Sequence, residues 1–122
     1  MIVVGTEDGR LADILAGEIE AEGFAVAWCT SGQDVLDTVL AHSVAAVFLD
    51  GPLAVFDGYT TSTLLRDDPD VAPDLPVILL CATEPDRRRV ERAGFSHVLP
   101  HAHSRQDVRE LLSGLGATGP EI

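Results

Sequence analysis

The sequence predicts an α/β domain in which five parallel strands alternate with five helices. The first observation is that five short apolar runs recur along the chain. Three of them contain almost no polar residue, as expected of parallel strands covered on both faces. The second observation is that the segments between these runs carry apolar residues at helical spacing. The expected strands are residues 2–4, 24–29, 44–49, 77–81 and 97–99.

The segments after these strands carry start or stop signals typical of helices. Gly23 ends the first helical periodicity, and Ser31 has a side chain suited to capping the second helix. Pro85 suits the first turn of the fourth helix, and Gly94 suits its C-terminal end. We expect helices that begin near residue 11, follow Ser31, cover residues 58–66 and 84–93, and begin near Ser104.

A strand followed by a helix, five times over, implies right-handed crossovers and a doubly wound (βα)5 sheet. Five strands in a chain of this length suit the flavodoxin-like strand order 2-1-3-4-5. In such sheets, ligands bind at the carboxyl ends of the strands, near the switch point between strands 1 and 3. The topology therefore places residues 5–8 beside Asp50 and Gly51.

Length and composition limit the class of protein. A chain of 122 residues, 46% of them hydrophobic, can bury one core, so we expect one domain over residues 1–116 and a flexible tail over 117–122. The net charge of -12 opposes direct binding to nucleic acid or anionic membranes. We expect no secretory signal, because the first residues, MIVVGTEDG, lack a basic segment, and no apolar run approaches the length of a membrane span of about 20 residues. We therefore expect a cytoplasmic protein with reduced cysteines.

Acidic residues gather at the predicted carboxyl edge of the sheet. Asp50 ends the third apolar run, and Glu7 and Asp8 follow the first run. Neighbouring carboxylates repel one another unless a cation or a proton intervenes. Because Mg²⁺ prefers oxygen ligands, the candidate ligands for this cofactor are Glu7, Asp8, Asp50 and the backbone carbonyl of Gly51. The alternative for Asp8 is a solvated loop acid or a helix N-cap.

Four segments resemble the CheY-like receiver domains of two-component response regulators. The segments are GFAVAWCTSGQDVL, AVFLDGPLAVFDGY, RDDPDVAPDLPVILL and RAGFSHVL. The resemblance covers nearly the whole chain, and it implies a role in phosphorelay signalling with a protein partner such as a histidine kinase. It also implies that Asp50 is the phosphoacceptor.

The residues that support phosphorylation in this family are substituted here. The resemblance places the family's acidic pair on Thr6 and Glu7, so one of the two carboxylates is missing. The family's hydroxyl position falls on Cys81, whose thiol is a weaker donor. The lysine position falls on His101, and the chain contains no lysine. The position of the aromatic switch residue falls on Val98.

These substitutions favour an atypical receiver, or pseudo-receiver, that acts mainly as a protein–protein interaction module without catalytic activity. A charge pair at about 4 Å is worth about 4 kcal/mol at an effective dielectric of about 20. The missing lysine and carboxylate therefore remove several kcal/mol of support for a phosphorylated Asp50. The alternative is a working phosphoacceptor in which Glu7, Asp8 and His101 act as partial substitutes. A small enzyme or ligand-binding domain on the same fold is the least favoured class.

The predicted fourth helix also carries a basic cluster, formed by Arg87, Arg88, Arg89 and Arg92. One hypothesis is that the cluster is a docking patch for an acidic partner. The alternative is a solvated helix face whose arginines pair with the neighbouring acids Asp86 and Glu91.

Overall fold

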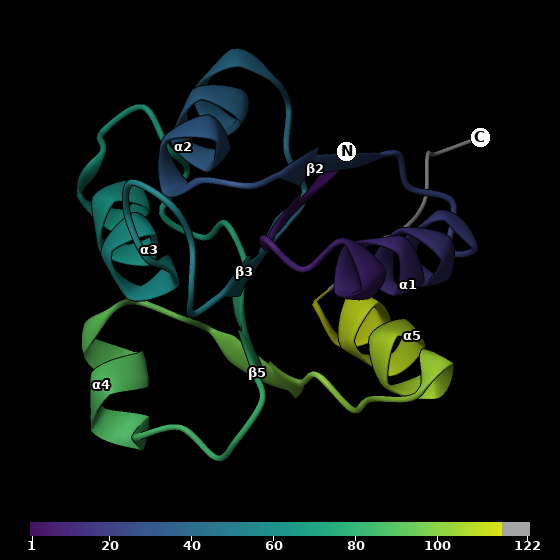
Figure 1. Ribbon diagram of the computed structural model, residues 1–122. Helices are drawn as coiled ribbons and strands as arrows, with labels where there is room; N and C mark the ends of the chain where they lie inside the picture. Colours follow the sequence, from purple (N-terminus) through teal and green to yellow (C-terminus); the bar gives the residue numbers. More distant parts are fainter. Residues whose placement is uncertain (116–122) are drawn as a thin grey trace.

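The computed structural model describes residues 1–115, so the tail expected at 117–122 lies outside the described residues. Strands and helices alternate along the chain (Figure 1). The strands are Ile2–Gly5 (β1), Val26–Cys29 (β2), Ala46–Asp50 (β3), Val77–Cys81 (β4) and His97–Pro100 (β5). The helices are Gly9–Glu20 (α1), Gly32–Ala41 (α2), Gly58–Asp67 (α3), Arg87–Arg92 (α4) and Arg105–Gly114 (α5).

The five strands form one parallel sheet in the order β2-β1-β3-β4-β5, which confirms the predicted flavodoxin-like topology. The second and third strands were each predicted to begin two residues earlier than they do. In the sheet register, Ile2 opens β1 and pairs with Val26 on one side and Ala46 on the other. Residues before Val26 and Ala46 have no paired residue in β1, so both strands begin there.

Helices cover both faces of the sheet, with α2, α3 and α4 on one face and α1 and α5 on the other (Figure 1). Successive residues of the central strands pack alternately against the helices on one face of the sheet and the helices on the other. Leu49 and Leu79 pack in the α2–α4 layer, and Phe48 and Ile78 pack in the α1–α5 layer. Each of these side chains is at most 1% exposed, so both faces of β3 and β4 are buried, as their apolar sequences predict.

The fourth helix is shorter than predicted, because it spans Arg87–Arg92 rather than residues 84–93. The Asp86 side chain caps it by accepting the backbone N–H groups of Arg88 and Arg89. Pro85 therefore lies outside the helix, where it also disfavours a helical conformation for the residue before it. The predicted C-terminal ends at Gly23 and Gly94 are confirmed, since both glycines have positive φ angles, of 93° and 84°.

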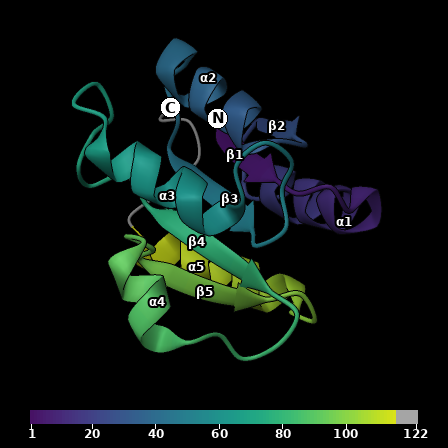
Figure 2. The same ribbon diagram turned by 60° about the vertical axis from the view of Figure 1, so that its left-hand side comes forward.

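The carboxyl ends of the strands share one edge of the sheet. Figure 2 shows the arrowheads of β4 and β5 side by side at this edge. The register pairs Gly5 with Leu49, Asp50 with Leu80 and Cys81 with Pro100, so the loops that follow the strands meet there. Over residues 1–115, no helix is long and apolar enough to cross a membrane.

Candidate functional site

Asp50, the last residue of β3, lies at the centre of the predicted site and is only 5% exposed. The Thr6 hydroxyl donates to its Oδ2 at 2.8 Å. The backbone N–H of Gly51 donates to its Oδ1 at 3.0 Å, and Nε2 of His101 lies 3.0 Å from the same oxygen. Because a carboxylate accepts hydrogen bonds, Nε2 carries the proton in this pair. Both oxygens of Asp50 are thus engaged by groups of the chain itself.

Thr6 directly follows β1 and is fully buried. Its hydroxyl donates to Asp50 and also accepts the backbone N–H of Asp8 at 3.1 Å. Its carbonyl accepts the indole N–H of Trp28 at 2.8 Å. Two of these hydrogen bonds hold the hydroxyl and the third holds the backbone of Thr6, so Thr6 acts as a built-in donor to Asp50 at the position where the resemblance implies a carboxylate.

The other candidate metal ligands have different surroundings. The Asp8 carboxylate caps α1 by accepting the backbone N–H groups of Arg10 and Leu11, as the N-cap alternative predicted. Glu7 is exposed, and the Gly51 carbonyl accepts the N–H of Gly58 at 2.8 Å. Among the described residues, no group of three or more His, Cys, Asp or Glu side chains is arranged to hold a metal ion. The Mg²⁺ ligand set stays a prediction.

Cys81 and His101 lie beside Asp50, as the resemblance implies. All three line a cavity of about 260 Å³ at the edge of the sheet. Burial raises the pKa of the Cys81 thiol, and the negative charges of Asp50 and Glu84 raise it further. The thiol is therefore protonated at neutral pH, and its Sγ lies 3.8 Å from the carbonyl oxygen of Leu99.

The sequence profile of the response regulator receiver domain matches residues 2–113. The chain belongs to this family. A curated relative, the uncharacterized transcriptional regulatory protein YbdJ of Bacillus subtilis (strain 168), is 32% identical over 81 residues. These residues are 66% of this chain and 34% of YbdJ, so the chain spans about a third of that relative's length.

Solved structures of receiver domains share the fold. A putative response regulator from Chloroflexus aurantiacus J-10-fl superimposes with a TM-score of 0.85 at 23% identity, over 94% of this chain and 96% of that chain. The receiver domain of sensor histidine kinase PA1611 from Pseudomonas aeruginosa PAO1 has a TM-score of 0.81 at 21% identity, over 94% and 97%. That PA1611 structure has a magnesium ion coordinated in its active site cleft.

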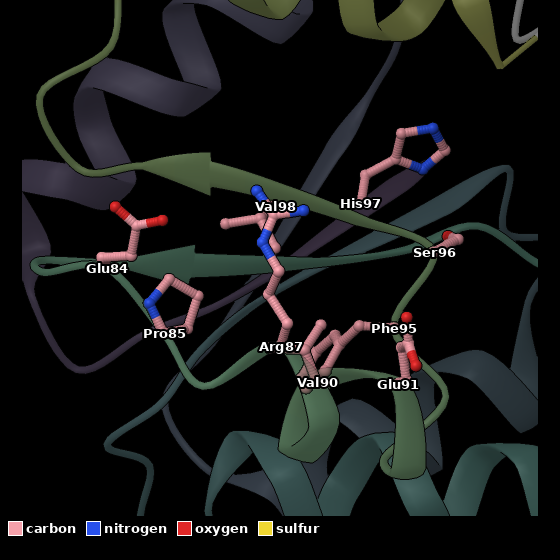
Figure 3. Close-up of a pocket in the computed structure, with 9 residues that line it drawn as sticks. All are labelled: Glu84, Pro85, Arg87, Val90, Glu91, Phe95, Ser96, His97 and Val98. Carbon is pink, nitrogen blue, oxygen red and sulfur yellow. The ribbon is translucent and has the colours of Figure 1, made fainter.

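Val98, at the receiver's switch position, lies on β5 and is 39% exposed. It lines a cavity of about 340 Å³ between α4 and β5 (Figure 3). Figure 3 shows Arg87 extending from α4 toward β5, and His97 pointing away from the other lining side chains.

The four arginines of the predicted docking patch all lie on α4 and are exposed. The alternative expected them to pair with Asp86 and Glu91. The ion pairs found within residues 1–115 are His101–Asp50, His103–Glu18 and Arg109–Glu22, and none involves an arginine of α4. Of the two acids, Asp86 is used as the N-cap of the helix.

Two contacts that support the site have no signal in the sequence. The His103 ring lies between Glu18, at 2.6 Å from Nε2, and the carbonyl of Pro100, at 3.0 Å from Nδ1. This contact ties the loop that carries His101 to α1. The second contact is that of Trp28 with the Thr6 carbonyl. Both join residues far apart in sequence, and no motif relates them.

Proposed function

We propose that this receiver domain acts mainly as a protein–protein interaction module in two-component or phosphorelay signalling, with phosphorylation of Asp50 impaired or absent. The observation that carries the proposal is the set of hydrogen bonds around Asp50. Its Oδ2 accepts from Thr6, and its Oδ1 accepts from Gly51 and His101. These three donors stabilise the negative charge of the carboxylate, so they lower the nucleophilicity of both oxygens toward phosphorus.

The groups that would bind the oxygens of a transferred phosphoryl group are also poor hydrogen-bond donors or lack a permanent positive charge. The Cys81 thiol is a poorer donor than the hydroxyl that the family uses. His101 supplies a positive charge only when it is protonated, and its Nε2 is already bonded to Asp50. A phosphorylated Asp50 would therefore add negative charge to a partly buried site that lacks a permanent cation.

Mg²⁺ fits the residues around Asp50 poorly. A hard cation favours several oxygen ligands. Here the Asp8 carboxylate is committed to the N-terminus of α1, and the Thr6 hydroxyl points its proton at Asp50. Nε2 of His101 lies 3.0 Å from Oδ1 of Asp50, so it competes with a cation for that oxygen. Magnesium in the cleft of the PA1611 receiver is consistent with weak binding at the same place in this fold.

The alternative is a working phosphoacceptor, phosphorylated at Asp50 by a histidine kinase. One observation favours it. Asp50 lines the cavity of about 260 Å³ together with exposed residues such as Pro52 and Thr83, so a small phosphodonor has space beside the carboxylate. In this alternative His101, in its protonated form, would take the role of the missing lysine.

The proposed partner is a signalling protein, such as a histidine kinase, in the cytoplasm. The net charge of -12 supports a protein partner rather than nucleic acid or an anionic membrane, because both of these would be repelled. We propose no catalytic activity for the domain, because burial and the charges of Asp50 and Glu84 raise the pKa of the Cys81 thiol, and a protonated thiol is a poor nucleophile.

A labelling experiment tests the proposal. The domain is incubated with Mg²⁺ and radiolabelled acetyl phosphate, and separately with a panel of phosphorylated histidine kinases. We expect no more label on the natural chain than on the Asp50→Asn variant. A positive control is the Thr6→Asp/Cys81→Thr/His101→Lys variant, which restores the family's residues. Label that depends on Asp50 in the natural chain would contradict the proposal and support the alternative.

A further inference from the structure

The arginines of α4 concentrate positive charge in an otherwise acidic protein. The chain has eight basic residues besides its histidines, against 20 acidic ones. Four of the eight lie within the six residues of α4, and all four are exposed. In the described part of the chain none of the four has an ion-pair partner, whereas Arg109 of α5 pairs with Glu22. In residues 1–115 no carboxylate lies within ion-pairing distance of these four guanidinium groups, although Glu91 belongs to the same helix and Asp86 caps it.

Two of these arginines line a groove between α3 and α4, which lie next to each other on the same face of the sheet (Figure 1). The groove has a volume of about 390 Å³. We call it the α3–α4 groove and define it by Tyr59, Thr63, Leu64, Arg89, Arg92 and Ala93. It combines apolar surface with two cations. It shares Tyr59 with the cavity at Asp50 and shares no lining residue with the cavity beside Val98.

Arg89 is held in position for binding. Its guanidinium carbon lies 3.8 Å from the centre of the Tyr59 ring. The Tyr59 ring in turn packs edge-to-face against Phe95, with 5.4 Å between the ring centres and an interplanar angle of 86°. Stacking uses the flat face of a guanidinium and leaves the N–H groups at its edge free for a carboxylate. The ordering of this long side chain is therefore largely complete before a ligand arrives.

We propose that the α3–α4 groove is a docking site for a short acidic peptide segment of a protein partner. The proposal rests on the proposed function as an interaction module and names the class of segment that the module binds. Carboxylates of the segment pair with Arg89 and Arg92, and an apolar side chain packs against Leu64 and Tyr59. Leu64 is 36% exposed, so it offers apolar surface that the domain itself leaves uncovered.

The surroundings of the groove favour a short segment over an extended polyanion. Asp57 and Asp86 cap the N-termini of α3 and α4 at one end. Asp67 and Asp68 lie at the C-terminal end of α3. Nucleic acid or an anionic bilayer would extend beyond the arginines and meet these carboxylates, whereas a short peptide would not. The distribution of charges around the groove therefore favours a short acidic peptide over nucleic acid or an anionic bilayer.

The test is a chemical-shift titration of the ¹⁵N-labelled domain with a synthetic peptide of about ten residues. The peptide is rich in glutamate and aspartate and has leucines at helical spacing of about three to four residues. We expect amide shifts that centre on Leu64 and Arg89. The Arg89→Gln/Arg92→Gln variant should bind about tenfold more weakly, because two exposed charge pairs are lost. Raising the salt concentration to about 1 M should also weaken binding, because it shortens the screening length to about 3 Å.

The matched control is Arg87→Gln/Arg88→Gln, which removes the same charge from the same helix outside the groove. It should weaken binding less than about threefold. Equal losses in the two double variants, or no shifts in the groove, would overturn the proposal. Tighter binding of duplex DNA or phosphatidylserine vesicles than of the peptide would overturn it as well. Labelling of Asp50 is a separate readout, so the failure of the groove and the failure of the proposed function can be told apart.

Discussion

The hydrogen bond from Thr6 to Asp50 should contribute measurably to the stability of the domain. Thr6→Val keeps the shape of the side chain but removes the hydroxyl, which donates to Oδ2 at 2.8 Å. Thr6 is fully buried and Asp50 is 5% exposed, so water cannot readily replace the lost donor. A hydrogen bond to a charged group contributes about 1.5–3 kcal/mol. We therefore expect the free energy of unfolding to fall by about 2 kcal/mol.

Urea denaturation, followed by far-ultraviolet circular dichroism, measures this loss as a shift of the midpoint by about 1 M. Thr61→Val is the matched control, because Thr61 is also fully buried but donates to the neutral carbonyl of Asp57 at 2.7 Å. It should cost about 1 kcal/mol. In an Asp50→Ala background, Thr6→Val should lose most of its effect. An undiminished cost in that background would refute the hydrogen bond as the cause.

Three further predictions concern the packing around Asp50, the reactivity of the Cys81 thiol and the contact of His103 with α1. A Cβ on Gly58 would lie 2.2 Å from the Asp50 carbonyl oxygen, so Gly58→Ala should lower the unfolding free energy by about 2 kcal/mol or more. Gly17→Ala, at a helical position with open space, should raise it by about 0.5–1 kcal/mol. Alkylation of Cys81 by iodoacetamide should be slow near pH 7 and faster in Asp50→Asn, because removing that charge lowers the pKa of the thiol; an unchanged rate would contradict this. The His103 side chain is 1% exposed and lies 2.6 Å from a carboxylate of α1, so His103→Gln should cost about 2 kcal/mol, and a neutral effect in urea denaturation would refute the link.

The strand order could be predicted from sequence because each strand carries its own signal. The runs that became β3 and β4 are apolar on both faces, and only a parallel sheet between two helical layers buries both. The predicted start of α4, at residue 84, was wrong because two local signals compete in this segment. Pro85 is compatible with a first helical turn, but Asp86 is a stronger N-cap and its carboxylate reaches Arg88 and Arg89.

The members of the Asp50 site were also predictable, but their bonding was not. Thr6 and His101 directly follow strands and Cys81 ends one, and the carboxyl ends of these strands share one edge of the sheet, so topology places all three beside Asp50. Spacing along the chain does not say whether His101 reaches the carboxylate, which depends on the course of the loop after β5. That loop is positioned by the contact of His103 with α1, for which the sequence carries no pattern.

Asp50 is engaged by groups of the chain itself, and we propose that it does not switch the domain. The most direct test is a titration of the ¹⁵N-labelled domain with beryllofluoride and Mg²⁺, a mimic of the phosphoryl group. We predict small shifts confined to the loops around Asp50. The Thr6→Asp/Cys81→Thr/His101→Lys variant serves as the responsive control. Large shifts in the natural chain that spread from Asp50 to α4 would contradict the claim.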